Sequence, residues 1–555
     1  MFEALTPGLE QAVVDLARTR MSLDPVPLDG SATPTELAER AGPTVTPDGI
    51  GGLAALRVFD EVLSRACISA DHPRNLAFIP AAPTRASILF DLVVGASSIY
   101  GGSWLEGAGA VHAENEALRW LSELVGFPAE AGGAFVQGGT IGNLSALVAA
   151  RHAARARRAA RGLPAPARWS ILFDLVVGAS SIYGGSWLEG AGAVHAENEA
   201  LRWLSELVGF PAEAGGAFVQ GGTIGNLSAL VAARHAARAR RAARGLPAPA
   251  RWSFLCGSEA HSSLRQAAEV MDVDAVFVAA DDDGRLTGQA VAAALGALGT
   301  RGPGPPGSRG AATGTGGDSG VFAVVATAGS TQFGVVDDIR GIVDAARPHD
   351  LWVHVDGAYG LAGVAAPSTR HLFDGVGDAD SFIVDPHKWL FAPFDACALV
   401  YRDPAAARAA HAQQAGYLEV LDRDSPWNPS DYQIGLSRRV RGLPFWFSLA
   451  AYGTRAYSRA VEGCLATARA AADRIRELPY VELVREPELS VVVLRRLGWS
   501  AEDYHRWTTW LLGSGLGFVT PTVHNEETVT RFAIVNPRTT PDDIDRILAT
   551  MSDGR

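Results

Sequence analysis

Two stretches of the sequence decide the predicted fold: LWVHVDGAYG (351–360) and SFIVDPHKWL (381–390). Each begins with a short apolar run of strand length and passes directly to polar residues. Asp356 closes the first run, and Lys388 follows the second run, 32 residues further along the chain. That distance is about one strand–helix–strand step. Both residues are therefore expected at the carboxyl edge of a parallel sheet, where open α/β sheets bind ligands.

Lys388 is the only lysine among the 48 basic residues of the chain. Arginine stays protonated and cannot form a Schiff base, so Lys388 is a candidate for amine chemistry. The alternative interpretation is that a single lysine escaped a compositional drift toward arginine by chance.

Further apolar runs on either side extend the same pattern. They alternate with helical segments such as 338–346, which predicts an α/β fold with a large, doubly wound, mostly parallel sheet. From about residue 460, helices mix with short strands, which indicates a smaller C-terminal α+β domain. The strands expected in the large sheet are 253–256, 275–278, 321–327, 351–355 and 381–384.

Residues 87–169 and 170–252 are identical over 83 positions. Structural repeats normally occur as several diverged units, and this seam falls inside an apolar run, where a folding unit would not normally begin. We interpret the repeat as a recent tandem duplication or an assembly artefact, with one copy surplus, in preference to a functional repeat. Setting one copy aside leaves 472 residues.

The predicted organisation has four parts. They are an N-terminal helical segment (1–86), a large cofactor-binding domain that includes both copies (87–400), a loop with connecting helices (401–459) and the small domain (460–555).

Composition excludes several classes of protein. With 48% hydrophobic residues, 19% charged residues and a net charge of −12, the chain is predicted to be globular and not to bind nucleic acid. The four cysteines form no CxxC pair, and no metal site is predicted. No signal peptide and no apolar run of about 18 residues are found, so we expect a cytoplasmic protein without membrane segments.

Two further features complete a chemical set. Gly221-Gly222-Thr223, with its twin at 138–140, joins a predicted strand to a helix, and such a turn can cradle a phosphate. His261 follows the strand 253–256. Alone, the first is most often a simple turn and the second a neighbour of a helix cap. Together with Asp356 and Lys388, they supply a phosphate cradle, a stacking imidazole, a partner for a ring nitrogen and an amine, as an internal aldimine of pyridoxal 5′-phosphate (PLP) requires.

The motifs HVDGAY (354–359) and DPHKWL (385–390) resemble those of the group II PLP-dependent amino-acid decarboxylases, which include the aromatic L-amino-acid decarboxylases. The resemblance extends from about residue 72 to residue 538. It implies the type I fold of aspartate aminotransferase, PLP as the cofactor and a homodimer with shared active sites.

The resemblance also assigns roles to residues. It implies that Lys388 is the Schiff-base lysine, that Asp356 pairs with the pyridine nitrogen, and that Ala358 and His261 lie against the ring. The remaining implied cofactor contacts are Thr331, near the phenolic oxygen, and His387, beside the phosphate.

Other implied positions lie further from the ring. Tyr417 resembles the tyrosine of a mobile loop that protonates the substrate carbon, although it could be a packing aromatic. The substrate pocket is implied to include His72, Pro73 and Phe78. One departure from the family is Asp385, which replaces the commoner asparagine and adds a negative charge near the cofactor.

Spacing favours the second copy as the source of the cradle. Thr223 precedes His261 by 38 residues and Thr140 precedes it by 121, whereas family spacing is a few tens. We therefore expect Gly222 and Thr223 to bind the phosphate. The upstream part of the repeat could come from either copy.

The expected activity is decarboxylation of a small-molecule L-amino acid to the corresponding amine, through an internal aldimine on Lys388. The alternatives are an aldehyde synthase or another lyase on the same fold, or an inactive product of the duplication. Tyrosine rather than phenylalanine at position 417 disfavours the oxidative route. The residues do not identify the amino acid.

Overall fold

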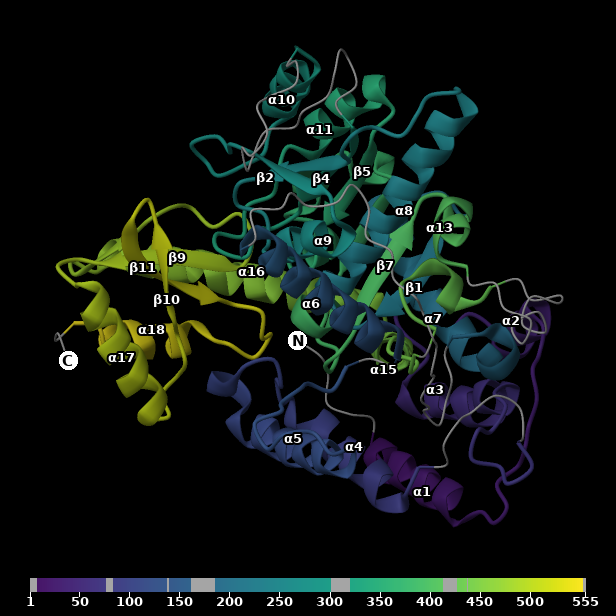
Figure 1. The fold of residues 1–555 in the computed structure, drawn as a ribbon. Helices are drawn as coiled ribbons and strands as arrows, with labels where there is room; N and C mark the ends of the chain where they lie inside the picture. The colour runs from purple at the N-terminus through teal and green to yellow at the C-terminus, as the bar shows by residue number, and fades with distance from the viewer. Residues whose placement is uncertain are drawn as a thin grey trace.

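The computed structural model describes residues 7–75, 83–136, 139–160, 185–300, 320–412, 427–436 and 438–552. Its centre is a seven-stranded sheet in the order β1-β7-β6-β5-β4-β2-β3 (Figure 1). The run β6-β5-β4-β2-β3 is parallel, and β7 is antiparallel to both of its neighbours. The strands are β1 (Gly215–Val219), β2 (Ser253–Gly257), β3 (Asp274–Val278), β4 (Val321–Thr327), β5 (Trp352–Asp356), β6 (Ser381–Val384) and β7 (Cys397–Tyr401).

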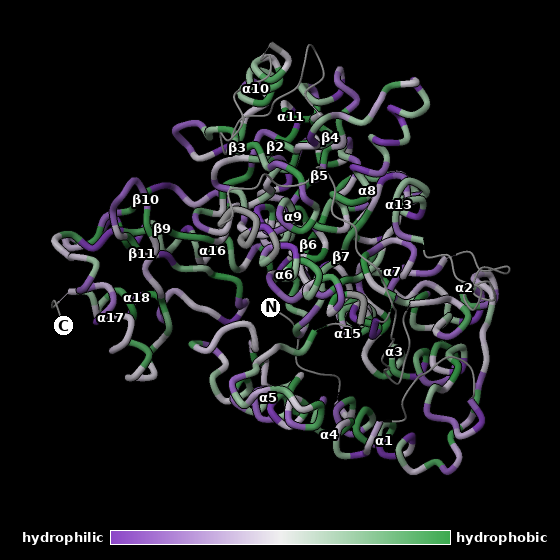
Figure 2. Tube along the Cα trace, viewed as in Figure 1, coloured by the Kyte–Doolittle hydropathy of each residue, from purple (hydrophilic) through white to green (hydrophobic). Residues whose placement is uncertain are grey.

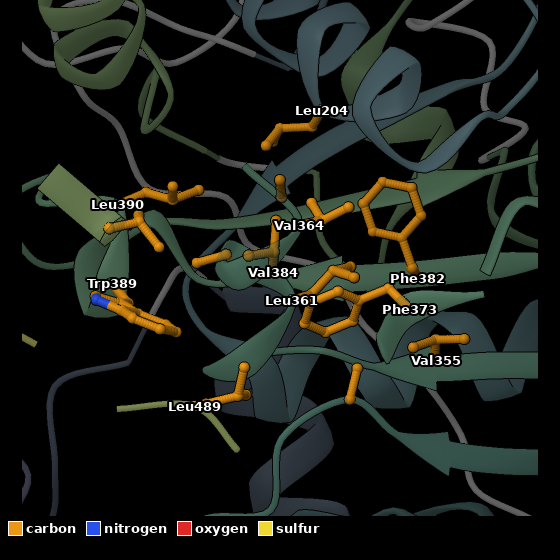
Figure 3. Close-up of a cluster of buried hydrophobic side chains, with 14 of the residues drawn as sticks. Leu204, Val355, Leu361, Val364, Phe373, Phe382, Val384, Trp389, Leu390 and Leu489 are labelled. Carbon is orange, nitrogen blue, oxygen red and sulfur yellow. The ribbon is translucent and has the colours of Figure 1, made fainter. Parts of the chain in front are cut away.

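The five strands predicted from apolar runs are confirmed, and so is the mostly parallel α/β class. These runs become central strands because both faces of the sheet are covered, so every position must be apolar. Phe382 and Val384 of β6 join one hydrophobic core, and Ile383 between them joins the other. Figure 3 shows Phe382 and Val384 in the first core beside Leu361 and Leu204.

Helices cover the two faces. Those on the side of Phe382 include α7 (Trp187–Val208), α11 (Ile339–Ala346), α15 (Leu443–Tyr452) and α16 (Thr454–Glu477). Those on the side of Ile383 include α8 (Gly222–Ala243), α9 (Ser263–Met271) and α13 (Pro404–His411). The sheet is therefore doubly wound, as predicted.

A smaller unit follows α16, at the left of Figure 1. Its four-stranded antiparallel sheet has the order β10-β11-β9-β8 and carries two helices. The elements are β8 (Val481–Leu483), β9 (Val491–Arg496), α17 (Ala501–Gly513), β10 (Pro521–His524), β11 (Glu527–Ala533) and α18 (Pro541–Ala549).

The two identical copies occupy different environments. The second copy supplies α7, β1 and α8, and Trp203 of α7 is 9% exposed. The first copy forms α4 (Arg85–Ser97), α5 (Trp104–Leu124) and α6 (Gly139–Ala160), and its equivalent residue Trp120 is 62% exposed. Figure 1 places α4 and α5 at the lower edge beside α1 (Leu9–Ser22), and Figure 2 shows hydrophobic positions along both helices. The second copy is therefore part of the core, whereas the identical sequence of the first copy lies mostly on the surface.

The first copy still contacts the large domain. Arg151 of α6 donates to the carbonyl of Val270 at the end of α9 (3.4 Å), and Asp91 of α4 pairs with Arg439 (3.3 Å). Tyr100 packs on Phe394, with ring centroids 5.8 Å apart. No helix in the described ranges is long and apolar enough to cross a membrane.

Candidate active site

Polar residues gather at one edge of the large sheet because parallel strands end there together. Asp356 ends β5, and Lys388 lies in the short helix α12 (Pro386–Trp389) directly after β6. Gly222 begins α8 after β1, and His261 follows β2. The antiparallel strand β7 begins at the same edge, which brings Cys397 into the group.

The Lys388 amine is held by a neighbouring carboxylate. Its Nζ lies 2.9 Å from Oδ2 of Asp385, whose side chain is 2% exposed, whereas the Lys388 side chain is 39% exposed. Burial by itself lowers the pKa of Lys388, but Asp385, and then Asp356, raise it more, so the net shift is upward. The amine is therefore held as an ammonium ion in this arrangement.

The backbone of Lys388 is anchored by its neighbour. Trp389 is fully buried and stacks on Tyr359, with ring centroids 5.3 Å apart. Figure 3 shows Trp389 and Leu390 among the side chains of the apolar core. This packing explains why a lysine can hold a fixed position on a four-residue helix.

A buried hydrogen-bond network orients Asp356. Asn226 of α8 donates from Nδ2 to Asp356 Oδ2 (2.8 Å), and its Oδ1 lies 2.9 Å from His354 Nε2. Because a carboxylate only accepts, the amide orientation is fixed, and His354 must carry its proton on Nε2. His354 Nδ1 then accepts from the Ser381 hydroxyl (2.9 Å). Burial lowers the pKa of His354 to about 4, so the ring is neutral near pH 7.

The same network reaches His261. Asn226 Nδ2 also donates to Ser263 Oγ (3.0 Å), which lies 3.0 Å from His261 Nδ1. The N–H of Ser263 points to the same ring nitrogen (3.2 Å). His261 Nδ1 is therefore a hydrogen-bond acceptor, and Ser263 at the start of α9 orients the exposed ring.

The start of α8 approaches the loop after β5 closely. A Cβ atom on Gly222 would lie 3.1 Å from the Cβ of Ala358, so only glycine fits without displacing a neighbour. The Gly222 N–H donates to Asp385 Oδ2 (3.3 Å). His387 borders this turn, and its ring packs on Phe394 at 4.9 Å. Gly222 therefore lies beside Ala358, Asp385 and His387, whereas the twin Gly139 begins the surface helix α6.

Other expected site residues have different surroundings. Thr331 is exposed, and its carbonyl accepts from Arg531 of β11. His72 is buried, and its Nδ1 accepts the N–H of Arg74 (3.0 Å), while Pro73 is exposed on the same turn. Among the described residues, no hydrogen bond or ion pair joins His72 to Lys388. Tyr417 and Phe78 lie outside the described residues.

Three residues that contribute to the site were not predicted from the sequence. Asn226 lies one helical turn after Gly222 and so points toward the same edge of the sheet. His354 precedes Asp356 by two residues on β5, and this spacing places both on one face. Arg531 could not be found this way, because its proximity to Thr331 depends on how the small sheet packs against the large domain.

These residues fit PLP. The set contains an amine, a buried carboxylate fixed by an amide and a glycine-lined helix start. A cation, Arg531, lies beside the carbonyl of Thr331. One group fits a phosphate poorly: Asp385 already occupies the Gly222 N–H with a carboxylate.

Comparison with known proteins agrees with this set of groups. The model of the pyridoxal-dependent decarboxylase conserved domain matches residues 167–496, more than half of the chain. This match includes the second copy and omits nearly all of the first. The L-2,4-diaminobutyrate decarboxylase of Rhizobium meliloti (strain 1021) is 30% identical over 388 residues, 68% of this chain and 73% of that protein. The aromatic-L-amino-acid decarboxylase of Bacillus atrophaeus is 25% identical over 399 residues, 70% of this chain and 78% of that protein.

Solved structures show the same fold. Mouse CSAD superposes with a TM-score of 0.57 at 26% identity, over 66% of this chain and 77% of that chain. Oryza sativa TDC with PLP and tryptamine superposes with a TM-score of 0.60 at 20% identity, over 100% of this chain and 99% of that chain. The second likeness shows the fold alone.

Proposed function

Because the chain belongs to the pyridoxal-dependent decarboxylase family, a family of PLP-dependent carboxy-lyases, we propose that it converts an L-amino acid to the corresponding amine at the site around Lys388. The observation that carries this proposal is the position of the only lysine. Lys388 lies at the carboxyl edge of the sheet, and Asp356 is close enough to raise its pKa. Arginine could not replace it, because a guanidinium does not act as a neutral amine.

When bound, PLP supplies an electron sink that accepts the electron pair released as the bond to the carboxylate breaks. Lys388 would hold the cofactor covalently, and Asp356 would keep a proton on the ring nitrogen. Asn226 supports this role because it donates to Asp356 Oδ2 at 2.8 Å and so fixes the plane of the carboxylate.

The faces and ends of the cofactor are assigned to other groups. His261 would cover one ring face, and Ala358 would lie against the ring. The start of α8, with Gly222 and Thr223, would hold the phosphate through its N–H groups. His387 borders this cradle, and Thr331 is assigned to the phenolic oxygen.

Arg531 is the proposed partner of the substrate carboxylate. Its guanidinium donates to the carbonyl of Thr331, so a cation from the small domain lies beside a proposed site residue. Burial lowers the pKa of Arg531, and a partly buried cation gains from an anionic partner. Tyr417, outside the described residues, is assigned the return of a proton to the substrate carbon. By family resemblance we propose a homodimer.

The test is a screen of carboxyl-labelled amino acids with the purified holoprotein. The set includes aromatic, acidic and diamino acids, and the readouts are labelled carbon dioxide and the product. Release of carbon dioxide with an equal amount of amine supports the proposal, and Lys388→Ala must abolish it. An aldehyde with peroxide would indicate the oxidative alternative. A holoprotein that releases carbon dioxide from none of these acids would overturn the proposal.

A further inference from the structure

Asp385 contacts two groups that the cofactor needs. Its Oδ2 lies 2.9 Å from Lys388 Nζ and also accepts the Gly222 N–H at 3.3 Å. The first contact holds the amine as an ammonium ion. The second occupies the first donor of the proposed phosphate cradle. One carboxylate thus contacts both the amine that would react with the aldehyde and an N–H of the proposed phosphate cradle.

Cofactor binding puts this carboxylate in conflict with its surroundings. A phosphate at the start of α8 brings a second anion next to Asp385, whose side chain is only 2% exposed. Lys388 must also lose a proton before it can react, and it then no longer neutralises Asp385. A buried charge without a partner is strongly unfavourable, so the proton that Lys388 gives up is expected to stay within the pair.

We propose that Asp385 is a positioning residue that controls cofactor capture: it locks Lys388 as an ammonium ion and accepts its proton when the phosphate enters the cradle. This inference rests on the proposed function of Lys388. The proton moves from Nζ to Oδ2, which leaves a neutral amine and a carboxylic acid. The amine then forms a C=N bond to the aldehyde carbon, and the aldehyde oxygen leaves as water. The neutral acid can donate a hydrogen bond to the phosphate.

The other ionisable groups around the pair do not replace Asp385. Asp356 faces Lys388 from β5, but its Oδ2 accepts from Asn226. Cys397 faces the pair from β7, and burial, with Asp385, raises the pKa of its thiol well above the usual range, so it stays protonated. His387 Nε2 lies 3.7 Å from Asp385 Oδ2, while its Nδ1 lies 2.7 Å from the Ala396 carbonyl.

The test measures covalent capture at Lys388 against pH, with pyridoxal and with PLP as separate probes. Cofactor-free wild type and Asp385→Asn are compared by borohydride trapping and mass spectrometry, so enzyme activity is not the readout. Asparagine resembles the protonated acid, and it removes Asp385, which contributes most to raising the pKa of Lys388 against the effect of burial. We expect the midpoint for pyridoxal capture to shift down by at least about one pH unit, which means at least about tenfold faster capture at neutral pH.

The phosphate gives a second, separable effect. Asp385→Asn should accelerate the capture of PLP more than the capture of pyridoxal. Added inorganic phosphate should inhibit PLP capture more strongly in the variant than in the wild type. Asp395→Asn is the control, because Asp395 lies on the same connection but pairs with Arg441 (3.3 Å). Asp385→Ser provides a second neutral substitution if the asparagine variant does not fold.

Unchanged pH midpoints in the Asp385 variants, or equal gains with both probes, would overturn the inference while leaving Lys388 as the site of capture. If no probe attaches to Lys388 even in the wild type, the proposed function itself fails.

Discussion

Replacing Trp203 by alanine should destabilise the protein strongly, whereas the same substitution at the identical position of the first copy, Trp120, should have almost no effect. The two residues share their local sequence for tens of residues on either side. They therefore share every local propensity and differ only in tertiary surroundings. The comparison isolates packing as the variable.

The magnitude follows from the structure. Trp203 is 9% exposed, and its ring lies 6.1 Å from the ring of Phe445 and 5.8 Å from that of Tyr457. Truncation of a buried tryptophan to alanine costs about 4 kcal/mol, a large share of the roughly 5–15 kcal/mol that stabilises a typical domain. Trp120 is 62% exposed, and substitutions at such positions change stability by about 0.5 kcal/mol or less.

The assay is thermal unfolding of both variants and the wild type at one protein concentration and one cofactor concentration. At about 2 °C per kcal/mol, Trp203→Ala should lower Tm by roughly 8 °C and Trp120→Ala by roughly 1 °C or less. Equal losses in the two variants would refute the assignment of the second copy to the core. Two negligible losses would refute it as well, because either copy would then be filling the same site.

Three further predictions test other contacts. Glu197→Ala should lower the free energy of unfolding by several kcal/mol in denaturant, because Glu197 accepts two hydrogen bonds of 2.7 and 2.8 Å from the buried Arg438. Glu114→Ala, at the identical position of the exposed first copy, should change it little, and similar losses in the two variants would contradict this assignment. Arg531→Ala should raise KM for the amino acid about tenfold or more while PLP binding stays near wild type, and an unchanged KM would remove Arg531 from the substrate site. The pKa of His354 is about 4 in the folded protein and 6.5 in the unfolded chain, so its contribution to stability is full above pH 6.5 and is lost as pH falls toward 4. His354→Gln should therefore make the free energy of unfolding fall less steeply between these pH values. An equal slope in the variant and the wild type would contradict a buried neutral ring.

The sequence predicted the large sheet because its central strands are apolar on both faces and end in polar residues. Asp356 and Lys388 could be placed at one edge for the same reason, since parallel strands end together. The antiparallel strand β7 was not predicted, because strand direction depends on the connection from β6 and not on the residues of the strand.

The remaining site contacts depend on tertiary packing. Asn226 reaches Asp356 only because α8 crosses the sheet beside β5 and β6, and no spacing in the sequence encodes that crossing. The upstream part of the repeat could not be assigned from identical residues. The structure places Tyr100 of the first copy against Phe394, while its twin Tyr183 lies outside the described residues.

Lys388 is the proposed attachment point of the cofactor. Reduction of the holoprotein with borohydride, followed by digestion and mass spectrometry, tests it directly, because Lys388 is the only lysine in the chain. We expect one phosphopyridoxyl group on the peptide that contains Lys388, and none on that peptide in Lys388→Arg. A label at the α-amino group alone, or cofactor retained without any label on Lys388, would contradict it.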